Sequence, residues 1–185
     1  MGNVESFYRK GDILDMNRKK IVLLALFCAV FSFEFILGSN AFCSGINEVE
    51  TEKIAVNLVK DVQKGGYGIV PTDELKQWMD QRKEMLIVFT GPEAGFRKGH
   101  YPGAVQFELP IPELKEMSEN ERSEFIKLLG SDKNRILVFY CGFTKCTRSH
   151  NGAIWATKLG YKNVYRCPGG IKGWIQAGFP IEKGN

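Results

Sequence analysis

The sequence predicts an α/β protein with a mainly parallel central sheet that is flanked by helices on both faces. From residue 48 onward, segments with strand character alternate with segments of helical spacing, and this alternation is typical of parallel sheets. Two strand segments, 85–89 and 135–140, are almost continuous apolar runs, as expected for strands covered on both faces. The connections between segments are short, which favours crossover helices packed on the sheet.

The spacing of apolar residues and the positions of glycine and acidic residues predict the first elements. Apolar residues recur at helical intervals over 48–63, and Gly65-Gly66 ends that helix. A short strand is expected over 68–70. Thr72 is expected to cap the next helix, because acidic residues occupy the first turn after it. The buried strand 85–89 then follows.

The middle of the chain combines a loop, a short strand and a capped helix. Residues 91–102 are expected to form a loop, and 104–107 a short strand. Ser118 and Glu121 have the spacing of a capping box, so a helix should start here and end at Gly130.

The C-terminal part contains the strongest strand pattern. The strand 135–140 is followed by a helix over 149–159, and the next strand is expected over 163–166. Gly169-Gly170 then leads into a last short helix around Trp174.

Composition excludes several classes of protein. The 185 residues are 44% hydrophobic and 25% charged, which is typical of a globular chain rather than a disordered one. A net charge of +4 is too small to indicate nucleic-acid binding. The five cysteines form no Cys-x-x-Cys pair and the two histidines lie far apart, so a zinc finger is not expected. The sequence implies no metal and no organic cofactor.

The N-terminus has the pattern of an export signal. Arg18-Lys19-Lys20 precedes an uncharged apolar run over 21–33, and Ser39-Asn40-Ala41 supplies small residues for cleavage. We interpret residues 1–41 as a cleavable signal peptide of an exported, periplasmic protein. The alternative is an uncleaved inner-membrane anchor formed by residues 21–37, which would be the chain's one contact with a membrane.

This division gives the domain prediction. We expect an N-terminal helical extension over 42–67 and one α/β domain over 68–185.

The predicted chemistry centres on the end of the strongest strand. In parallel sheets, ligands bind at the carboxyl ends of the strands, and the strand 135–140 places Cys141 there. The following helix N-terminus, the loop amides and the positive charges of Lys145 and Arg148 should favour the Cys141 thiolate, which is the nucleophilic form. The same cradle would hold a small anionic substrate. The residues expected to bind it are Gly142, Phe143, Thr144, Lys145, Thr147, Arg148 and Ser149. The alternative is that Cys141 is a small buried hydrophobic residue.

Cys146 lies on the same loop and allows two interpretations. As a resolving thiol it would attack a persulfide or sulfenate on Cys141 and form a disulfide. As a loop thiol it would only pack.

Other polar residues are weaker candidates. We expect His100 to tie down a turn, His150 to lie on a solvated helix face, and Cys167 to be structural.

Several short motifs together resemble the rhodanese-like sulfurtransferase family, from about Ile69 to Pro180. They are Gly99-His100-Tyr101-Pro102-Gly103-Ala104, Cys141 with Arg148-Ser149, Leu159-Gly160-Tyr161, Asn163-Val164-Tyr165, Gly169-Gly170, Trp174 and Ala177-Gly178-Phe179-Pro180. The resemblance implies a single-domain rhodanese that transfers sulfane sulfur from a donor such as thiosulfate, through a Cys141 persulfide, to cyanide or a thiol.

The chain departs from the family pattern at two places. The usual active loop is Cys-x4-Arg, whereas Arg148 lies seven positions after Cys141 and the extended loop contains Cys146. The family also commonly carries Asp at the end of the early strand, where this chain has Val88-Phe89.

Other functions remain open on the sequence. A thiol redox or sulfur-carrier module would cycle Cys141 and Cys146 with a protein redox partner. A non-catalytic binding domain usually lacks the cysteine. A phosphatase with a Cys-x5-Arg loop would need arginine at the position of Thr147.

Overall fold

The computed structural model describes residues 47–184, and its helices and strands belong to the compact unit Glu48–Asn185. The predicted signal peptide or anchor, residues 1–41, lies outside the described residues. Within the described range, no helix is both long enough and apolar enough to cross a membrane.

One five-stranded sheet forms the centre of this unit. Its order is β1-β5-β4-β2-β3, and every neighbouring pair is parallel, which confirms the predicted parallel sheet. The strands are β1 (Gly68–Ile69), β2 (Met85–Phe89), β3 (Val105–Gln106), β4 (Ile136–Tyr140) and β5 (Asn163–Arg166). The two strongest apolar runs, β2 and β4, lie side by side in the middle of the sheet, where both faces are covered.

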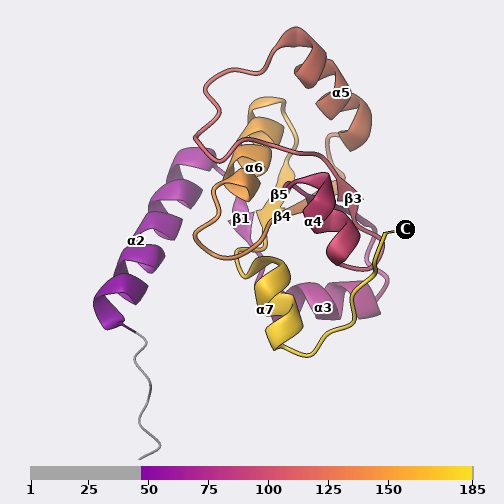
Figure 1. The fold of residues 1–185 in the computed structure, drawn as a ribbon. Coiled ribbons are helices and arrows are strands. Elements are labelled where there is room, and N and C mark those ends of the chain that lie inside the picture. The colour runs from indigo at the N-terminus through magenta and orange to yellow at the C-terminus, as the bar shows by residue number, and fades with distance from the viewer. Residues whose placement is uncertain (1–46, 185) are drawn as a thin grey trace, which may run out of the picture. The chain divides into compact units, whose positions relative to one another are not determined.

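Helices cover both faces of the sheet (Figure 1). They are α2 (Glu48–Gly65), α3 (Thr72–Asp80), α4 (Glu93–Lys98), α5 (Glu119–Leu129), α6 (Arg148–Lys158) and α7 (Gly170–Gln176). Helices α5 and α6 contribute to the core on one face, whereas α3 and α7 contribute to the core on the other.

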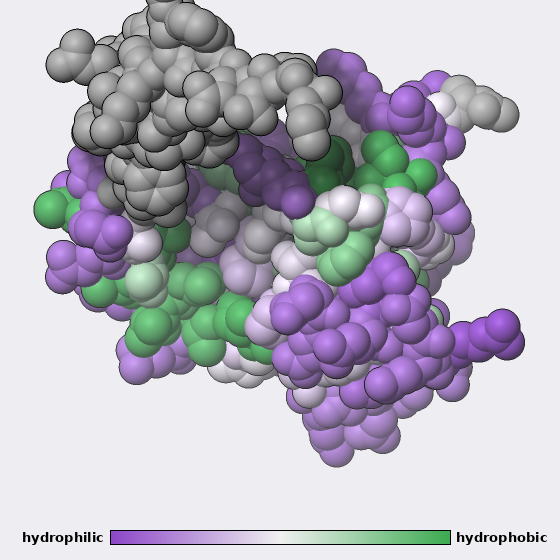
Figure 2. Space-filling model, turned by 90° about the horizontal axis from the view of Figure 1, so that it is seen from below, coloured by the Kyte–Doolittle hydropathy of each residue, from purple (hydrophilic) through white to green (hydrophobic). Residues whose placement is uncertain are grey.

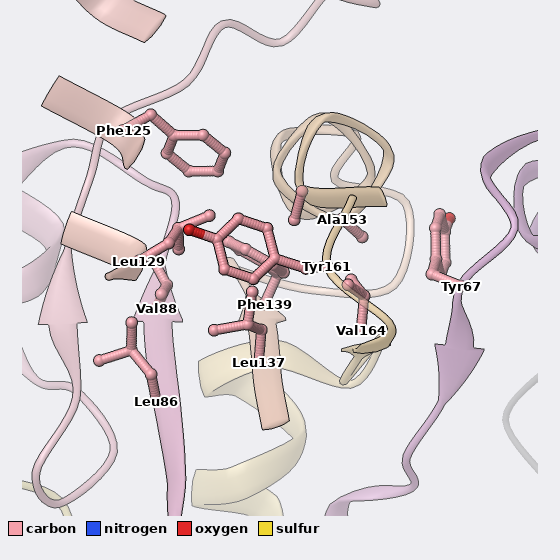
Figure 3. Packing of buried hydrophobic residues seen from close by; sticks show 11 residues of the cluster. Tyr67, Leu86, Val88, Phe125, Leu129, Leu137, Phe139, Ala153, Tyr161 and Val164 are labelled. Atoms are coloured by element: carbon pink, nitrogen blue, oxygen red, sulfur yellow. The ribbon is translucent and has the colours of Figure 1, made fainter. Parts of the chain in front are cut away.

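Side-chain alternation along the strands divides the core into two clusters. Leu137 and Phe139 of β4 point to one face, where they pack with Phe125 of α5 (Figure 3). Val138 and Tyr140 point to the other face and pack with Leu75 and Trp174. Because neighbouring residues of β4 belong to opposite clusters, the whole strand must be apolar.

A close approach between α6 and β4 positions the first turn of α6 beside the end of the strand. Gly152 of α6 packs directly on the ring of Phe139, and a Cβ at this position would lie 2.6 Å from that ring. The glycine therefore allows the helix to lie close to the sheet.

Two details differ from the sequence-based expectation. The segment 91–102 contains a short helix, α4, which starts after Pro92 and is supported by an ion pair between Glu93 and Arg97 at 2.6 Å. Thr72 is the first residue of α3 rather than its cap; Pro71 occupies the N-cap position, with no side-chain hydrogen bond. The capping box of α5 is confirmed, since Ser118 accepts from the Glu121 amide at 3.3 Å.

The surface carries some large apolar side chains. In the view from below, hydrophobic residues gather into an area flanked by hydrophilic ones (Figure 2). The exposed large hydrophobic residues of the described range are Val49, Val56, Val59, Ile111, Phe143 and Ile175.

Truncation of a core ring should test the packing. Phe125 is fully buried between α5 and the sheet. Phe125→Ala should lower the free energy of unfolding by about 3–5 kcal/mol, because the cavity adds to the lost burial. Ile175→Ala, at an exposed position, should change it by less than about 0.5 kcal/mol. Chemical denaturation of the two variants measures both values, and equal effects would contradict the assigned core.

Candidate active site

Cys141 lies at the carboxyl edge of the sheet, directly after β4, and is 1% exposed. Its thiol donates to the carbonyl of Cys146 at 3.3 Å and contacts the Ser149 hydroxyl at 3.3 Å. We call residues 141–147 the cysteine loop, since it starts at Cys141, contains Cys146 and ends where α6 begins. The structure therefore brings together the sequence-predicted residues Cys141, Cys146 and Ser149.

Backbone hydrogen bonds from the first turn of α7 hold the start of the cysteine loop. The amides of Ile171 and Lys172 donate to the carbonyls of Cys141 and Gly142 at 2.9 and 3.0 Å. Gly170 has a φ of +59°, and a Cβ there would lie 2.5 Å from the Cys141 carbonyl oxygen. Glycine is thus required twice at this position, for its backbone conformation and for the close approach.

The Cys146 thiol is half-buried and lies against hydrogen-bond donors. The Cys141 thiol and the backbone amides of Arg148 and Gly142 lie near it and favour its thiolate. The hydrogen bond from Cys141, these amides and the charge of Arg148 together lower the pKa of Cys146 to about 6. Within this pair the environment therefore favours the thiolate on Cys146 over one on Cys141.

Cys141 has the opposite shift. Its hydrogen bond to Cys146, its burial and the negative charge on Cys146 raise the pKa of the Cys141 thiol. From the sequence, the positive environment was expected to favour the Cys141 thiolate. The structure corrects this expectation, because the loop folds its amides around Cys146 and leaves Cys141 buried behind it.

A buried arginine that is not among the residues predicted from the sequence holds the site together. The guanidinium of Arg166, at the end of β5, donates to Ser149 Oγ at 3.0 Å and to Asp61 of α2 at 3.0 Å. It also donates to the carbonyls of Thr144 and Cys146, at 3.1 and 2.9 Å. One cation thus joins α2, α6 and the cysteine loop. The signal for it was the register, since β5 pairs with β4 and must end at the same edge of the sheet.

The two predicted cations of the loop are engaged with acidic partners. Lys145 pairs with Glu50 of α2. Arg148 donates to Glu108 at 3.1 Å and to the Leu109 carbonyl at 2.6 Å. Their charges remain close to the loop, but their side chains bind protein groups.

The remaining loop residues have mixed roles. Thr147 donates to the carbonyl of Ile111, and Phe143 is half exposed at the surface. Gly142 contributes backbone groups, as does Thr144, whose carbonyl binds Arg166.

Two hollows adjoin the cysteine loop. One, of about 430 Å³, lies between the loop and α2 and is lined by Lys53, Lys60, Thr144 and Arg166 among others. The second, of about 570 Å³, lies between the loop and α7, where Phe143 and Lys172 contribute. Thr144 and Lys145 of the loop line both hollows, whereas Cys141 and Cys146 line neither.

Other candidates lie away from this chemistry. His150 is buried rather than solvated, which corrects the expectation; its Nδ1 lies 2.8 Å from the Tyr67 hydroxyl, and burial lowers its pKa. His100 ties down its turn through the Phe96 carbonyl at 2.8 Å, as expected. Cys167 is buried beside Tyr101 and Thr72. Within residues 47–184, no cluster of three or more His, Cys, Asp or Glu residues is placed to hold a metal ion.

Loss of the Arg166 cation should destabilise the whole edge of the sheet. Arg166→Met should lower the free energy of unfolding by about 3–5 kcal/mol, because it leaves buried acceptors without their donor. Asp61→Asn should cost less, since the Asp61 side chain is 31% exposed. Denaturant unfolding of both variants provides the measurement, and a neutral effect of Arg166→Met would contradict the role given to the guanidinium.

The difference in pKa between the Cys141 and Cys146 thiols should be visible in pH-dependent alkylation. The rate of Cys146 modification by iodoacetamide should be constant at neutral pH and fall as the pH decreases through about 6, because protonation removes the thiolate. Cys146→Ser should abolish this phase, whereas Cys167→Ser should leave it unchanged. A midpoint near the ordinary cysteine value of about 8.5 would contradict the lowered pKa.

Two solved structures share this architecture over most of their own length. A polysulfide-sulfur transferase homodimer from Wolinella succinogenes is 12% identical, with a TM-score of 0.51 and coverage of 71% of this chain and 90% of that one. A protein of unknown function from Rhodopseudomonas palustris, described as a possible tyrosine phosphatase, is 21% identical, with a TM-score of 0.50 and coverage of 70% and 93%. These likenesses show the fold.

A larger enzyme also contains a similar part. The thiosulfate sulfurtransferase from Pseudomonas aeruginosa is 18% identical, with a TM-score of 0.48 over 67% of this chain and 22% of that enzyme. No curated protein sequence matches this chain. The rhodanese-like domain model, in contrast, matches residues 71–177, which is more than half of the chain. The chain therefore belongs to the rhodanese-like domain family.

Proposed function

We propose that this protein is a sulfurtransferase, which moves sulfane sulfur from a small anionic donor such as thiosulfate to cyanide or a thiol. The observation that carries the proposal is the pair of cysteines on the cysteine loop, where the Cys141 thiol donates to the Cys146 carbonyl at 3.3 Å and the pKa of the Cys146 thiol is lowered. This loop occupies the carboxyl edge of the sheet in a rhodanese-like domain, where parallel sheets bind their ligands.

The transfer needs a thiolate and donors for negative charge. A loop thiolate attacks the outer sulfur of thiosulfate, the sulfur–sulfur bond of the donor breaks, and sulfite leaves with the bonding electron pair. The cysteine then carries a persulfide. Attack by cyanide on the outer sulfur yields thiocyanate and restores the thiolate. The loop amides and the N-terminus of α6 stabilise the anionic states of this cycle.

The approach of an anionic donor is supported by charge around the loop. Lys53 and Lys60 line the hollow on the α2 side, and Lys172 lines the hollow on the α7 side. These lysines favour small anions through long-range attraction. We further propose that the protein acts after export, in the periplasm, and that a protein dithiol serves as its redox partner.

Two other functions have less support. Phosphatase chemistry of the Cys-x5-Arg type needs an arginine that faces the bound anion, whereas Arg148 is one position too late and binds Glu108 and the Leu109 carbonyl. A pure binding module has no need for a thiol with a lowered pKa, and this chain retains Cys146 in that state.

The assay of thiocyanate formation tests the proposal. The purified protein should convert thiosulfate and cyanide to thiocyanate and sulfite. The double variant Cys141→Ser/Cys146→Ser should lose this turnover by at least about a hundredfold, because both nucleophiles are removed. Cys167→Ser is the matched control, since Cys167 is a free buried cysteine outside the loop, and it should retain activity. Unchanged turnover in the double variant would overturn the proposed function.

A further inference from the structure

We propose that the cysteine loop reduces sulfane sulfur in two steps. Cys146 first accepts the sulfane sulfur, and Cys141 then expels it as hydrogen sulfide. The second step leaves a Cys141–Cys146 disulfide, which an external dithiol must reduce. This inference rests on the proposed sulfurtransferase function and adds an activity, the reduction of sulfane sulfur. It also reverses the roles that the sequence suggested for the two cysteines.

The difference in burial between the two cysteines assigns the first step to Cys146. Cys141 is 1% exposed and its thiol faces the Cys146 carbonyl and the Ser149 hydroxyl. Cys146 is half-buried near the end of the loop, next to Lys145, which lines both hollows. A donor as large as thiosulfate therefore meets the Cys146 thiol before the Cys141 thiol.

The difference in reactivity between the two thiols also indicates that Cys146 reacts first and Cys141 second. The nearby amides of Gly142 and Arg148 and the positive charge of Arg148 favour the Cys146 thiolate before any donor arrives. Cys141 keeps its proton, which lies toward the Cys146 carbonyl. A buried protonated thiol is a poor first nucleophile, but it is ideally placed for an attack on its neighbour.

Proximity of the two cysteines makes the second step possible. The Cys141 thiol donates to the backbone carbonyl of Cys146 at 3.3 Å, and four residues separate the two cysteines on one loop. The Ser149 hydroxyl and amide stabilise negative charge on Cys141, so this residue can release its proton when the persulfide forms beside it. Ser149 is thus a positioning residue, itself held by Arg166.

The two steps balance in atoms and electrons. In the first, the Cys146 thiol and thiosulfate give the Cys146 persulfide and sulfite. In the second, the Cys141 sulfur attacks the inner sulfur of the persulfide, the persulfide bond breaks, and hydrogen sulfide leaves with the bonding electrons and the proton of Cys141. The two cysteines are oxidised to a disulfide and the sulfane sulfur is reduced to sulfide. A dithiol reductant restores both thiols by exchange.

The third described cysteine shows that this arrangement is specific to the loop. Cys167 is also buried after a strand, but its sulfur lies 3.7 Å from the Tyr101 hydroxyl and 3.8 Å from Thr72 Oγ1. Its partners are hydroxyl groups, so it has no thiol to exchange with in the described part of the chain. Cys167→Ser therefore provides the control for any effect of removing a buried thiol.

A single-turnover experiment tests the two-step reduction of sulfane sulfur. The reduced, purified protein is mixed with thiosulfate without cyanide or added thiol, and sulfite, sulfide, free thiols and intact mass are measured. The wild type and Cys167→Ser should each release one sulfite and one sulfide per chain and lose two thiols, without a lasting gain of sulfur. Cys141→Ser and Cys141→Ala should release sulfite, retain one added sulfur on Cys146, and form at least tenfold less sulfide.

The outcomes separate the inference from the function on which it rests. If the wild type releases sulfite and keeps a stable persulfide without releasing sulfide, the proposed two-step reduction is wrong and the sulfurtransferase proposal stands. If Cys146→Ser accepts sulfur as fast as the wild type, the order of the two cysteines is wrong. If no variant releases sulfite from thiosulfate and thiocyanate formation is also absent, the proposed function itself fails.

Discussion

The candidate site depends on one buried cation, the guanidinium of Arg166. It emerges from the end of β5, beside β4, and its donors reach Asp61 of α2, Ser149 of α6 and two carbonyls of the cysteine loop. Burying this charge is costly unless its hydrogen bonds are satisfied, so the surrounding groups are held in one arrangement. Ser149 and the Cys146 carbonyl, which both contact the Cys141 thiol, are each fixed by the same group.

This arrangement explains why two cysteines of one loop differ. The Cys146 carbonyl, which Arg166 orients, accepts a hydrogen bond from the Cys141 thiol. The Ile171 amide of α7 holds the Cys141 carbonyl, next to Gly170, where no side chain fits. Cys146 is less buried, and the nearby amides of the loop lower the pKa of its thiol. The environment of the pair therefore favours the thiolate on Cys146. The cationic side chains Lys145 and Arg148 mainly bind acidic partners and contribute charge from a distance.

Local patterns allowed the sheet and most helices to be predicted, because strands β2 and β4 are apolar throughout and Ser118 forms its capping box with Glu121. The short helix α4 has few residues and a proline start, so its pattern was read as a loop. The position of Cys141 followed from strand polarity. The role of Arg166 did not, since Asp61 is more than a hundred residues away in sequence and only packing brings the two together. The order of the thiol pKa values likewise depends on the loop conformation, which spacing alone does not define.

The central claim is that the accessible Cys146, rather than the strand-end Cys141, receives sulfur first. The most direct measurement is peptide mapping by tandem mass spectrometry of the wild type, alkylated within the first fraction of a turnover after mixing with thiosulfate. The account predicts that the added sulfur is found on Cys146 at the earliest times, before any loop disulfide accumulates. Added sulfur that appears first on Cys141 would contradict it.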